Sequence, residues 1–203
     1  ASLSVGMCVV LVLPLTKRSK GVFIGGISGV IARIDEKLAS CEEAKRDFYE
    51  GMKICLNAVV NFSRRYAAEL RKMAETSENR EELLALADIC DRVPEQPAAT
   101  FHEAVQSVHF LTFCLSFAPQ RPISLQQFQL GHPDRYLYRF YKADREAGRL
   151  DDEQAQLILN CLGVMINRRV PHGLSSGYMV GGRDREGNLV ANELTMMGMQ
   201  VVD

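Results

Sequence analysis

The chain has 203 residues and a formal net charge of −1, with 24 basic and 25 acidic side chains. This length allows one good-sized hydrophobic core or two small ones, and we favour one. The near-zero charge gives no electrostatic reason to expect nucleic acid or an anionic membrane as a partner.

The cysteines and histidines do not predict a metal site. Six cysteines are scattered without a Cys-x-x-Cys pair or a zinc-type spacing. His102 and His109 lie seven residues apart, whereas metal-binding histidines on one helix are usually four apart. We expect free thiols that pack as small apolar side chains in the cytoplasm. The apolar run at residues 5–15 is too short to span a bilayer.

Apolar residues at helical spacing dominate the first half of the chain. The glycines of residues 25–29 predict a turn that enters a helix at residues 30–39. A longer stripe, with steps of three and four, predicts a long helix lying against a core. The stripe comprises Phe48, Met52, Cys55, Val59, Phe62, Tyr66, Leu70 and Met73.

Two further helices follow, each with a recognisable end. Residues 80–92 predict a shorter helix, which Pro94 and Pro97 stop because proline cannot continue a helix. Thr100 and Glu103 then form a capping-box pattern. It predicts the start of a helix that continues to residue 118.

Residues 130–150 combine a turn with an apolar helix. Gly131 and Pro133 predict a tight turn that leads into a helix, and Gly148 ends it. Asp151, with Gln154 three residues later, predicts the cap of a helix over residues 151–168. The face of the first of these helices is formed by Tyr136, Leu137, Phe140 and Tyr141.

The last part of the chain mixes a strand, a turn and a helix. Residues 178–180 predict a short strand, and residues 181–188 a turn. Asn192 is a natural cap for a final helix over residues 193–202. Upstream, residues 120–130 are polar and contain Gln126, Gln127 and Gln129. They predict a solvated loop or a short strand that presents amides into a pocket.

Three blocks of this sequence resemble the glycyl radical enzymes, the pyruvate formate-lyase-like proteins that include diol dehydratases and choline lyases. The blocks extend over residues 41–202. One holds the proline-bounded run from Ile89 to Gln106. Another is Gly131-His132-x-Asp134-Arg135-Tyr136-Leu137-Tyr138, followed by Phe140-Tyr141, Asp144, Gly148 and Leu150. The third is Gly181-Gly182-x-Asp184-x-x-Gly187, followed by Asn192-Glu193-Leu194-Thr195.

The resemblance implies an α/β fold. The chain would be a predominantly helical fragment with a few short strands, part of a ten-stranded barrel built from two five-stranded halves. Residues 1–203 would form one partial domain. Its helical layer would occupy residues 30–118, and the first barrel strands with their connecting helices residues 119–203.

The resemblance also implies radical chemistry. In the family a backbone glycyl radical oxidises a cysteine to a thiyl radical, which abstracts hydrogen from the substrate or attacks its carbonyl. The sequence contains neither the Gly-Cys-x-Glu-like loop nor the Arg-x-x-Gly-Tyr-like loop that carry these residues. We therefore expect an inactive internal fragment without a catalytic residue. Its parent would be a C–C, C–O or C–N lyase, a dehydratase or a formate C-acetyltransferase-like transferase of an anaerobic cytoplasm.

Two residues are candidates for substrate binding. The family lines its pocket four to five positions before the glycine of a Gly-Arg pair, and these positions hold Gln126 and Gln127. Two amides suit a small polar substrate as donors and acceptors. His132 replaces the arginine of the pair and loses its bidentate fork. We therefore expect an altered salt bridge there, and a helix-end pair at Asp134-Arg135.

The implied partners lie outside the chain. A radical activating enzyme with an iron–sulfur cluster would install the glycyl radical, so no cofactor or metal is expected on this chain. The parent would form a homo-oligomer. A different hypothesis remains open: a non-catalytic helical interaction module with a closed surface. An enzyme fragment would instead expose apolar faces and strand edges.

Overall fold

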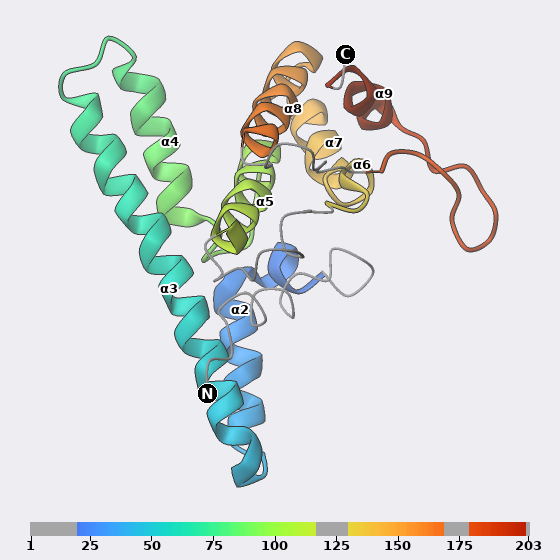
Figure 1. Cartoon of the computed structure of the whole chain (residues 1–203). Coiled ribbons are helices and arrows are strands. Elements are labelled where there is room, and N and C mark those ends of the chain that lie inside the picture. Colours follow the sequence, from blue (N-terminus) through green and yellow to red (C-terminus); the bar gives the residue numbers. More distant parts are fainter. Residues whose placement is uncertain (1–19, 117–129, 169–178, 202–203) are drawn as a thin grey trace. The chain divides into compact units, whose positions relative to one another are not determined.

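The computed structural model describes residues 20–116, 130–168 and 179–201, and almost all regular structure in these ranges is helical (Figure 1). Within these ranges, an isolated antiparallel β-bridge pairs Arg183 with Leu189. A predominantly helical chain is therefore confirmed. The strand expected at residues 178–180 is wrong for Met179 and Val180, which lie in irregular backbone. The helices are α2 (Lys20–Leu38), α3 (Glu43–Ala74), α4 (Arg80–Arg92), α5 (Phe101–Ser116), α6 (Pro133–Tyr136), α7 (Tyr138–Glu146), α8 (Asp152–Asn167) and α9 (Glu193–Gln200).

The described residues group into two compact units. One holds residues 20–98 and 106–116, and the other holds residues 99–105, 130–168 and 179–201. Helix α5 therefore contributes its first residues to the second unit and the remainder to the first.

Helix α3 organises the first unit, with α4 returning beside it and α2 packed along it (Figure 1). The buried face of α3 differs from the expected stripe, because Tyr66 is 41% and Met73 52% exposed. Ala67 of α3 packs instead against Ala87 and Cys90 of α4, and such small side chains let two helices approach closely. The buried residues of α3 are Leu56, Val59, Val60, Ser63, Ala67 and Ala74.

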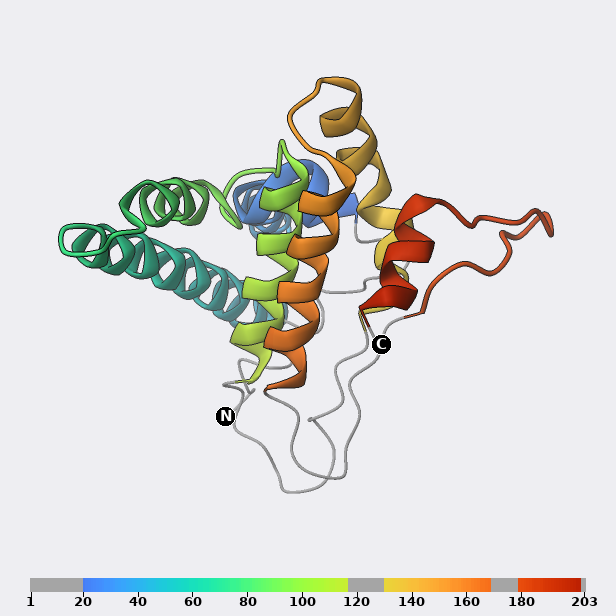
Figure 2. The same ribbon diagram turned by 90° about the horizontal axis from the view of Figure 1, so that it is seen from above.

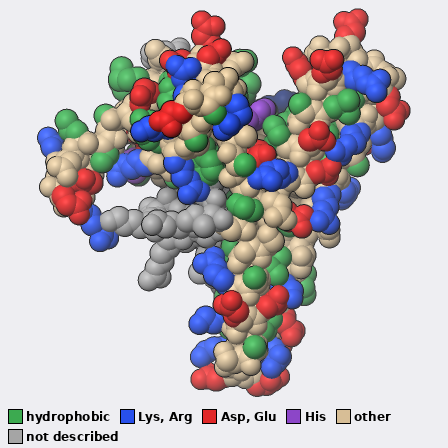
Figure 3. Space-filling view, turned by 180° about the vertical axis from the view of Figure 1, so that it is seen from behind, with side chains coloured by type: hydrophobic (Ala, Val, Ile, Leu, Met, Phe, Trp, Pro, Cys, Tyr) green, Lys and Arg blue, Asp and Glu red, His purple; other side chains and the backbone are tan. Residues whose placement is uncertain are grey.

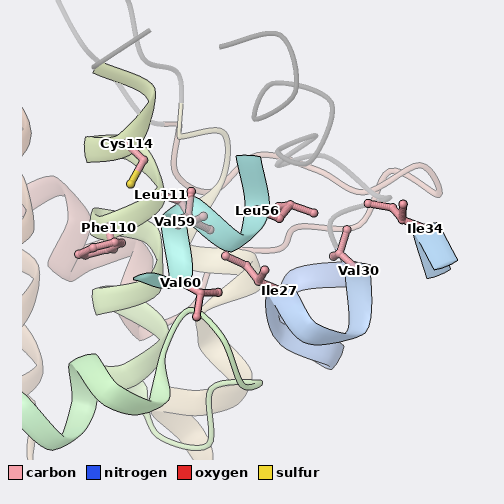
Figure 4. Packing of buried hydrophobic residues seen from close by; sticks show 9 residues of the cluster. All are labelled: Ile27, Val30, Ile34, Leu56, Val59, Val60, Phe110, Leu111 and Cys114. Carbon is pink, nitrogen blue, oxygen red and sulfur yellow. The ribbon is translucent and has the colours of Figure 1, made fainter. Parts of the chain in front are cut away.

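The main core of this unit forms where three helices meet, as Figure 4 shows. Each helix contributes aliphatic or aromatic side chains, so burial of apolar surface is the chief stabilising term. The cluster comprises Ile27, Val30 and Ile34 of α2, Leu56, Val59 and Val60 of α3, and Phe110, Leu111 and Cys114 of α5.

A kink at Gly26 lets α2 approach the loop that follows α4. The turn expected within residues 25–29 is confirmed at Gly26, whose backbone is not helical; helical backbone, expected from residue 30, extends from Lys20 to Leu38 on either side of this kink. Gly26 has φ 64°, and a Cβ built there would lie 2.2 Å from the carbonyl oxygen of Glu95. The N–H of Ile27 donates to the carbonyl of Pro94 at 2.9 Å. Glycine is therefore required by both backbone conformation and space.

In the second unit, the expected single helix is divided at Leu137 into α6 and α7. Leu137, Phe140 and Tyr141 are buried as predicted. Gly148 has φ 67° and lies just beyond the end of α7.

The caps of α8 and α9 follow the sequence closely. Asp151 and Gln154 form the expected capping box, and Asn192 forms another with Thr195. One apolar side chain of α8 lies outside its buried face, since Leu157 is 63% exposed. The buried residues of α8 are Ala155, Leu159, Leu162 and Ile166.

The described surface carries both signs of charge. Acidic and basic side chains are interspersed on the face shown in Figure 3, which agrees with the small net charge. Within the described ranges, no helix combines the length and apolar character that crossing a membrane requires.

Candidate functional site

Asp134 is the centre of a buried polar cluster in the second unit. Its side chain is 0% exposed, although it lies in the first turn of α6. Oδ2 accepts the N–H of Gly181 at 2.6 Å and the hydroxyl of Thr195 at 2.7 Å. The side-chain amide of Asn192 donates to the carbonyl of Asp134 at 2.9 Å. One residue of α6 thus holds both the Gly181 turn and the start of α9.

The turn at Gly181 is held from a second side by Arg135. Its Nη2 donates to the carbonyl of Gly181 at 2.6 Å, so Asp134 and Arg135 bind the two ends of one residue. They do not form the expected helix-end pair. Gly181 and Gly182 have φ of 66° and 85°, a region that glycine enters freely. A Cβ at Gly182 would lie 3.2 Å from Nη2 of Arg135.

His132 lies beside the second oxygen of Asp134 without bonding to it. Nδ1 of His132 and Oδ1 of Asp134 are 3.9 Å apart, which is too long for a hydrogen bond. Both atoms are buried, and neither has a hydrogen-bond partner in the described part of the chain. The resemblance places an arginine at this position, and the guanidinium of an arginine could donate two hydrogen bonds to a carboxylate. Because the imidazole is shorter, the Asp134 carboxylate is hydrogen-bonded through Oδ2 and not through Oδ1.

A small cavity lies against Asp134 and is too small for a substrate. It encloses about 20 Å³, room for about one water molecule, whereas ligand pockets usually enclose about 300–1,000 Å³. Leu130 and Leu137 line it together with side chains of α8 and α9. The Asp134 cluster is therefore a packing and positioning centre, not a binding pocket.

Two tyrosines, one in α6 and one in α7, have raised pKa values. Burial, followed by the nearby Asp134 charge, raises the pKa of Tyr136, whose hydroxyl donates to the carbonyl of Leu130 at 3.2 Å. Burial raises the pKa of Tyr141 to about 12, with a smaller part from its hydrogen bond to Asp152. Both hydroxyls remain protonated donors at neutral pH.

A second buried carboxylate joins α5 to α7. Oδ2 of Asp144 accepts the N–H of Phe101 at 2.7 Å, and Arg149 donates to Oδ1 through Nε and Nη2. The rings of Phe101 and Tyr141 pack edge to face beside it. Asp144 therefore satisfies a backbone donor of α5 that the helix itself leaves free.

The residues expected to bind substrate, Gln126 and Gln127, lie outside the described residues. The described chain resumes at Leu130, whose carbonyl accepts a hydrogen bond from the hydroxyl of Tyr136. The carbonyl of the next residue, Gly131, accepts the N–H of Met179 at 2.7 Å. These two bonds hold Leu130 and Gly131, the first described residues after the glutamine segment. Across the described ranges, no group of three or more His, Cys, Asp or Glu side chains could hold a metal ion.

Thr195 is the member of the cluster that the sequence did not reveal. The capping pattern predicted the role of Asn192 but gave no reason to place Thr195 near α6. Its hydroxyl accepts the N–H of Asn192 at 3.0 Å while donating to Asp134. The available signal was that Gly181, Asn192 and Thr195 fall in one of the family-like blocks.

Comparison with known proteins places these motifs in a family context. The pyruvate formate lyase-like family matches residues 20–203. Isethionate sulfite-lyase of Bilophila wadsworthia is 31% identical over 195 residues, covering 85% of this chain and 23% of the relative. A glycyl radical enzyme of Archaeoglobus fulgidus superimposes with a TM-score of 0.77 at 30% identity, covering 89% of this chain and 25% of the other.

A third relative extends the comparison to a dehydratase. The structure of hydroxyproline dehydratase from Clostridioides difficile, with trans-4-hydroxy-L-proline bound, superimposes with a TM-score of 0.75 at 27% identity. The superposition covers 90% of this chain and 26% of the dehydratase chain. The chain thus spans about a quarter of the length of the relatives it matches.

Proposed function

We propose that this chain, which belongs to the pyruvate formate lyase-like family, forms part of a glycyl radical enzyme of the lyase or dehydratase type. The observation that carries this proposal is the match over residues 20–203 together with a TM-score of 0.77 to a glycyl radical enzyme. The relatives reported above are a sulfite-lyase and a dehydratase, so cleavage of a C–S or C–O bond is favoured over acyl transfer.

The role we assign to this chain is to build and position one wall of the substrate site. In the family, the glycyl radical supplies a thiyl radical that takes a hydrogen atom from the substrate or attacks its carbonyl. The sequence has no loop of either radical-bearing type, so we propose that both come from polypeptide beyond these residues. The Asp134 cluster would anchor the segment that carries Gln126 and Gln127, and their amides would hydrogen-bond a small polar substrate.

The remaining parts of the proposal concern the assembled enzyme. It would contain the ten-stranded barrel of two five-stranded halves that the resemblance implies. A separate activating enzyme with an iron–sulfur cluster would generate the radical, and the enzyme would work as a homo-oligomer in an anaerobic cytoplasm. No cofactor is proposed on this chain.

The coding sequence tests the origin of the radical residues. We expect the reading frame to continue past codon 203 into a Gly-Cys-x-Glu-like loop and a terminal Arg-x-x-Gly-Tyr-like loop. We also expect the 203-residue chain alone to give no anaerobic turnover in the presence of an activating enzyme. A stop codon directly after codon 203, or turnover by the chain alone, would refute the proposal.

The glutamines are tested in the full-length enzyme. Gln126→Leu and Gln127→Leu should each raise KM for the substrate, because each removes a donor and an acceptor from the pocket. Gln120→Leu, at the start of the same polar segment, is the matched control and should leave KM unchanged. If all three substitutions change KM by the same amount, Gln126 and Gln127 make no specific contact with the substrate.

A further inference from the structure

An open groove lies between α3 and the C-terminal part of α5, within the first unit. Its volume is about 420 Å³, which falls in the range of small-molecule sites. Six side chains of α3, from Cys55 to Arg65, line it together with Cys114 of α5. They cover about 15 Å of the helix axis, so the groove is long enough for an extended small molecule.

The floor of this groove is apolar and uncharged. Val59 and Cys114, which line it, belong to the main core and are 5% and 8% exposed (Figure 4). Burial raises the pKa of Cys114 to about 12, so its thiol carries no charge at neutral pH. Phe62 adds an aromatic wall, with its ring stacked on Phe113 at 5.7 Å. Apolar matter is therefore favoured along the length of the groove.

Two exposed polar side chains, Asn61 and Arg65, are among the residues that line the groove. Asn61 and Arg65 are four residues apart on α3 and so lie on the same side of the helix. Within the described part of the chain, neither side chain makes a hydrogen bond or an ion pair. The adjacent Arg64, in contrast, pairs with Glu95 at 2.6 Å. An arginine without a counter-ion that lines an apolar groove favours an anionic head on an apolar body.

We propose that this groove binds a free medium-chain carboxylate. The alkyl chain would lie along Ala58, Val59 and Phe62, and the carboxylate would meet Arg65 and Asn61. A guanidinium matches a carboxylate with two parallel hydrogen bonds, and the asparagine amide supplies another donor. This site needs only side chains of the first unit, so its test is independent of the radical chemistry proposed above.

Cys55 reports occupancy directly, because it lines the groove and is partly accessible. The rate of its alkylation by iodoacetamide is measured by mass spectrometry on the 203-residue protein, with millimolar octanoate or 1-octanol. Cys161 of α8 is exposed and serves as the internal reference. Octanoate should slow alkylation of Cys55 several-fold and leave Cys161 unchanged. Protection by 1-octanol should require about two- to fivefold more ligand, the effect of a partly exposed ion pair.

Two pairs of substitutions separate the groove from general effects. Arg65→Gln should raise the octanoate concentration for half-protection about two- to fivefold. Arg64→Gln removes the same charge outside the groove and should leave that concentration unchanged. Ala58→Phe should fill the groove and abolish octanoate binding in calorimetry, whereas Ala68→Phe, another exposed alanine of α3, should not.

Three results would overturn the proposal. The first is that millimolar octanoate leaves Cys55 alkylation unchanged. The second is that 1-octanol protects as well as octanoate, which would remove the role of the carboxylate. The third is that the Arg64 and Arg65 variants behave alike.

Discussion

The hydroxyl of Thr195 donates a 2.7 Å hydrogen bond to Oδ2 of Asp134, across 61 residues of sequence. Both residues are buried, and the same hydroxyl accepts the N–H that begins the cap of α9. One small side chain therefore closes a helix end and satisfies part of a buried carboxylate. Loss of either partner should affect both segments together.

Asp134→Ala should lower the free energy of unfolding by about 2–4 kcal/mol, because it leaves the Gly181 N–H and the Thr195 hydroxyl buried without their acceptor. Urea denaturation followed by circular dichroism measures the loss. Asp88→Ala is the control, since that carboxylate is 76% exposed and should matter by less than about 0.5 kcal/mol. Equal losses in the two variants would contradict the assignment.

Thr195→Val should cost about 1–3 kcal/mol, because it keeps the shape of the side chain but removes the donor to Asp134. Thr195→Ser keeps the hydroxyl and should recover most of that loss. The two variants are compared by thermal melting at equal protein concentration. A serine variant no more stable than the valine variant would show that methyl packing, and not the hydrogen bond, is the dominant contribution.

Gly26→Ala should destabilise the protein by at least about 2 kcal/mol, since its φ of 64° disfavours an L side chain and the new Cβ would overlap Glu95. Gly29→Ala is the matched change on the same helix, with no atom near its Cβ. It should be stabilising by about 0.4–1 kcal/mol. Chemical denaturation of both variants checks the difference in sign, and two values of the same sign would refute it.

Alkaline pH should destabilise the fold through its buried thiols. Burial, followed for Cys90 by the charge of Asp91, raises the pKa of Cys90 to about 11, and burial raises that of Cys114 to about 12, from an ordinary 9.0. The unfolded chain therefore loses these protons first, so the contribution of the two thiols to stability is constant below about pH 9 and falls as the pH rises towards the folded values. Urea midpoints from neutral pH to pH 10 measure the fall.

Substitution of the thiols identifies their share of this pH dependence. Cys90→Ala and Cys114→Ala should each make the fall above pH 9 shallower, whereas Cys161→Ala, at an exposed thiol, should leave it unchanged. Buried tyrosines contribute only when the pH exceeds their ordinary value of 10.0. Identical slopes in all three variants would rule out the thiols as the cause.

Local signals in the sequence predicted local structure well. The bounds of α4 and the caps at Asp151 and Asn192 follow from residues close in sequence, so the prediction required no tertiary information. The buried face of α3 was predicted less well, because Ala67 and Ser63 do not look apolar enough to define a core. They are buried because α4 approaches closely, which depends on a partner helix rather than on periodicity.

The candidate site shows the same limit more strongly. The family-like blocks contained Asp134, Gly181 and Thr195, but no spacing indicated that these three residues meet. The contacts cross 47 and 61 residues, and the fold alone brings these positions together. The arginine-to-histidine difference at His132 was visible in the sequence, whereas the unbonded Oδ1 beside it required coordinates.

The bond between Phe101 and Asp144 has a consequence for synthesis of the chain. The backbone donor at the start of α5 binds a carboxylate that is made 43 residues later. At ordinary translation rates the ribosome needs about 2–9 s to add that stretch. The first turn of α5 is therefore synthesised before its partner exists, and this hydrogen bond forms only after α7 has been made.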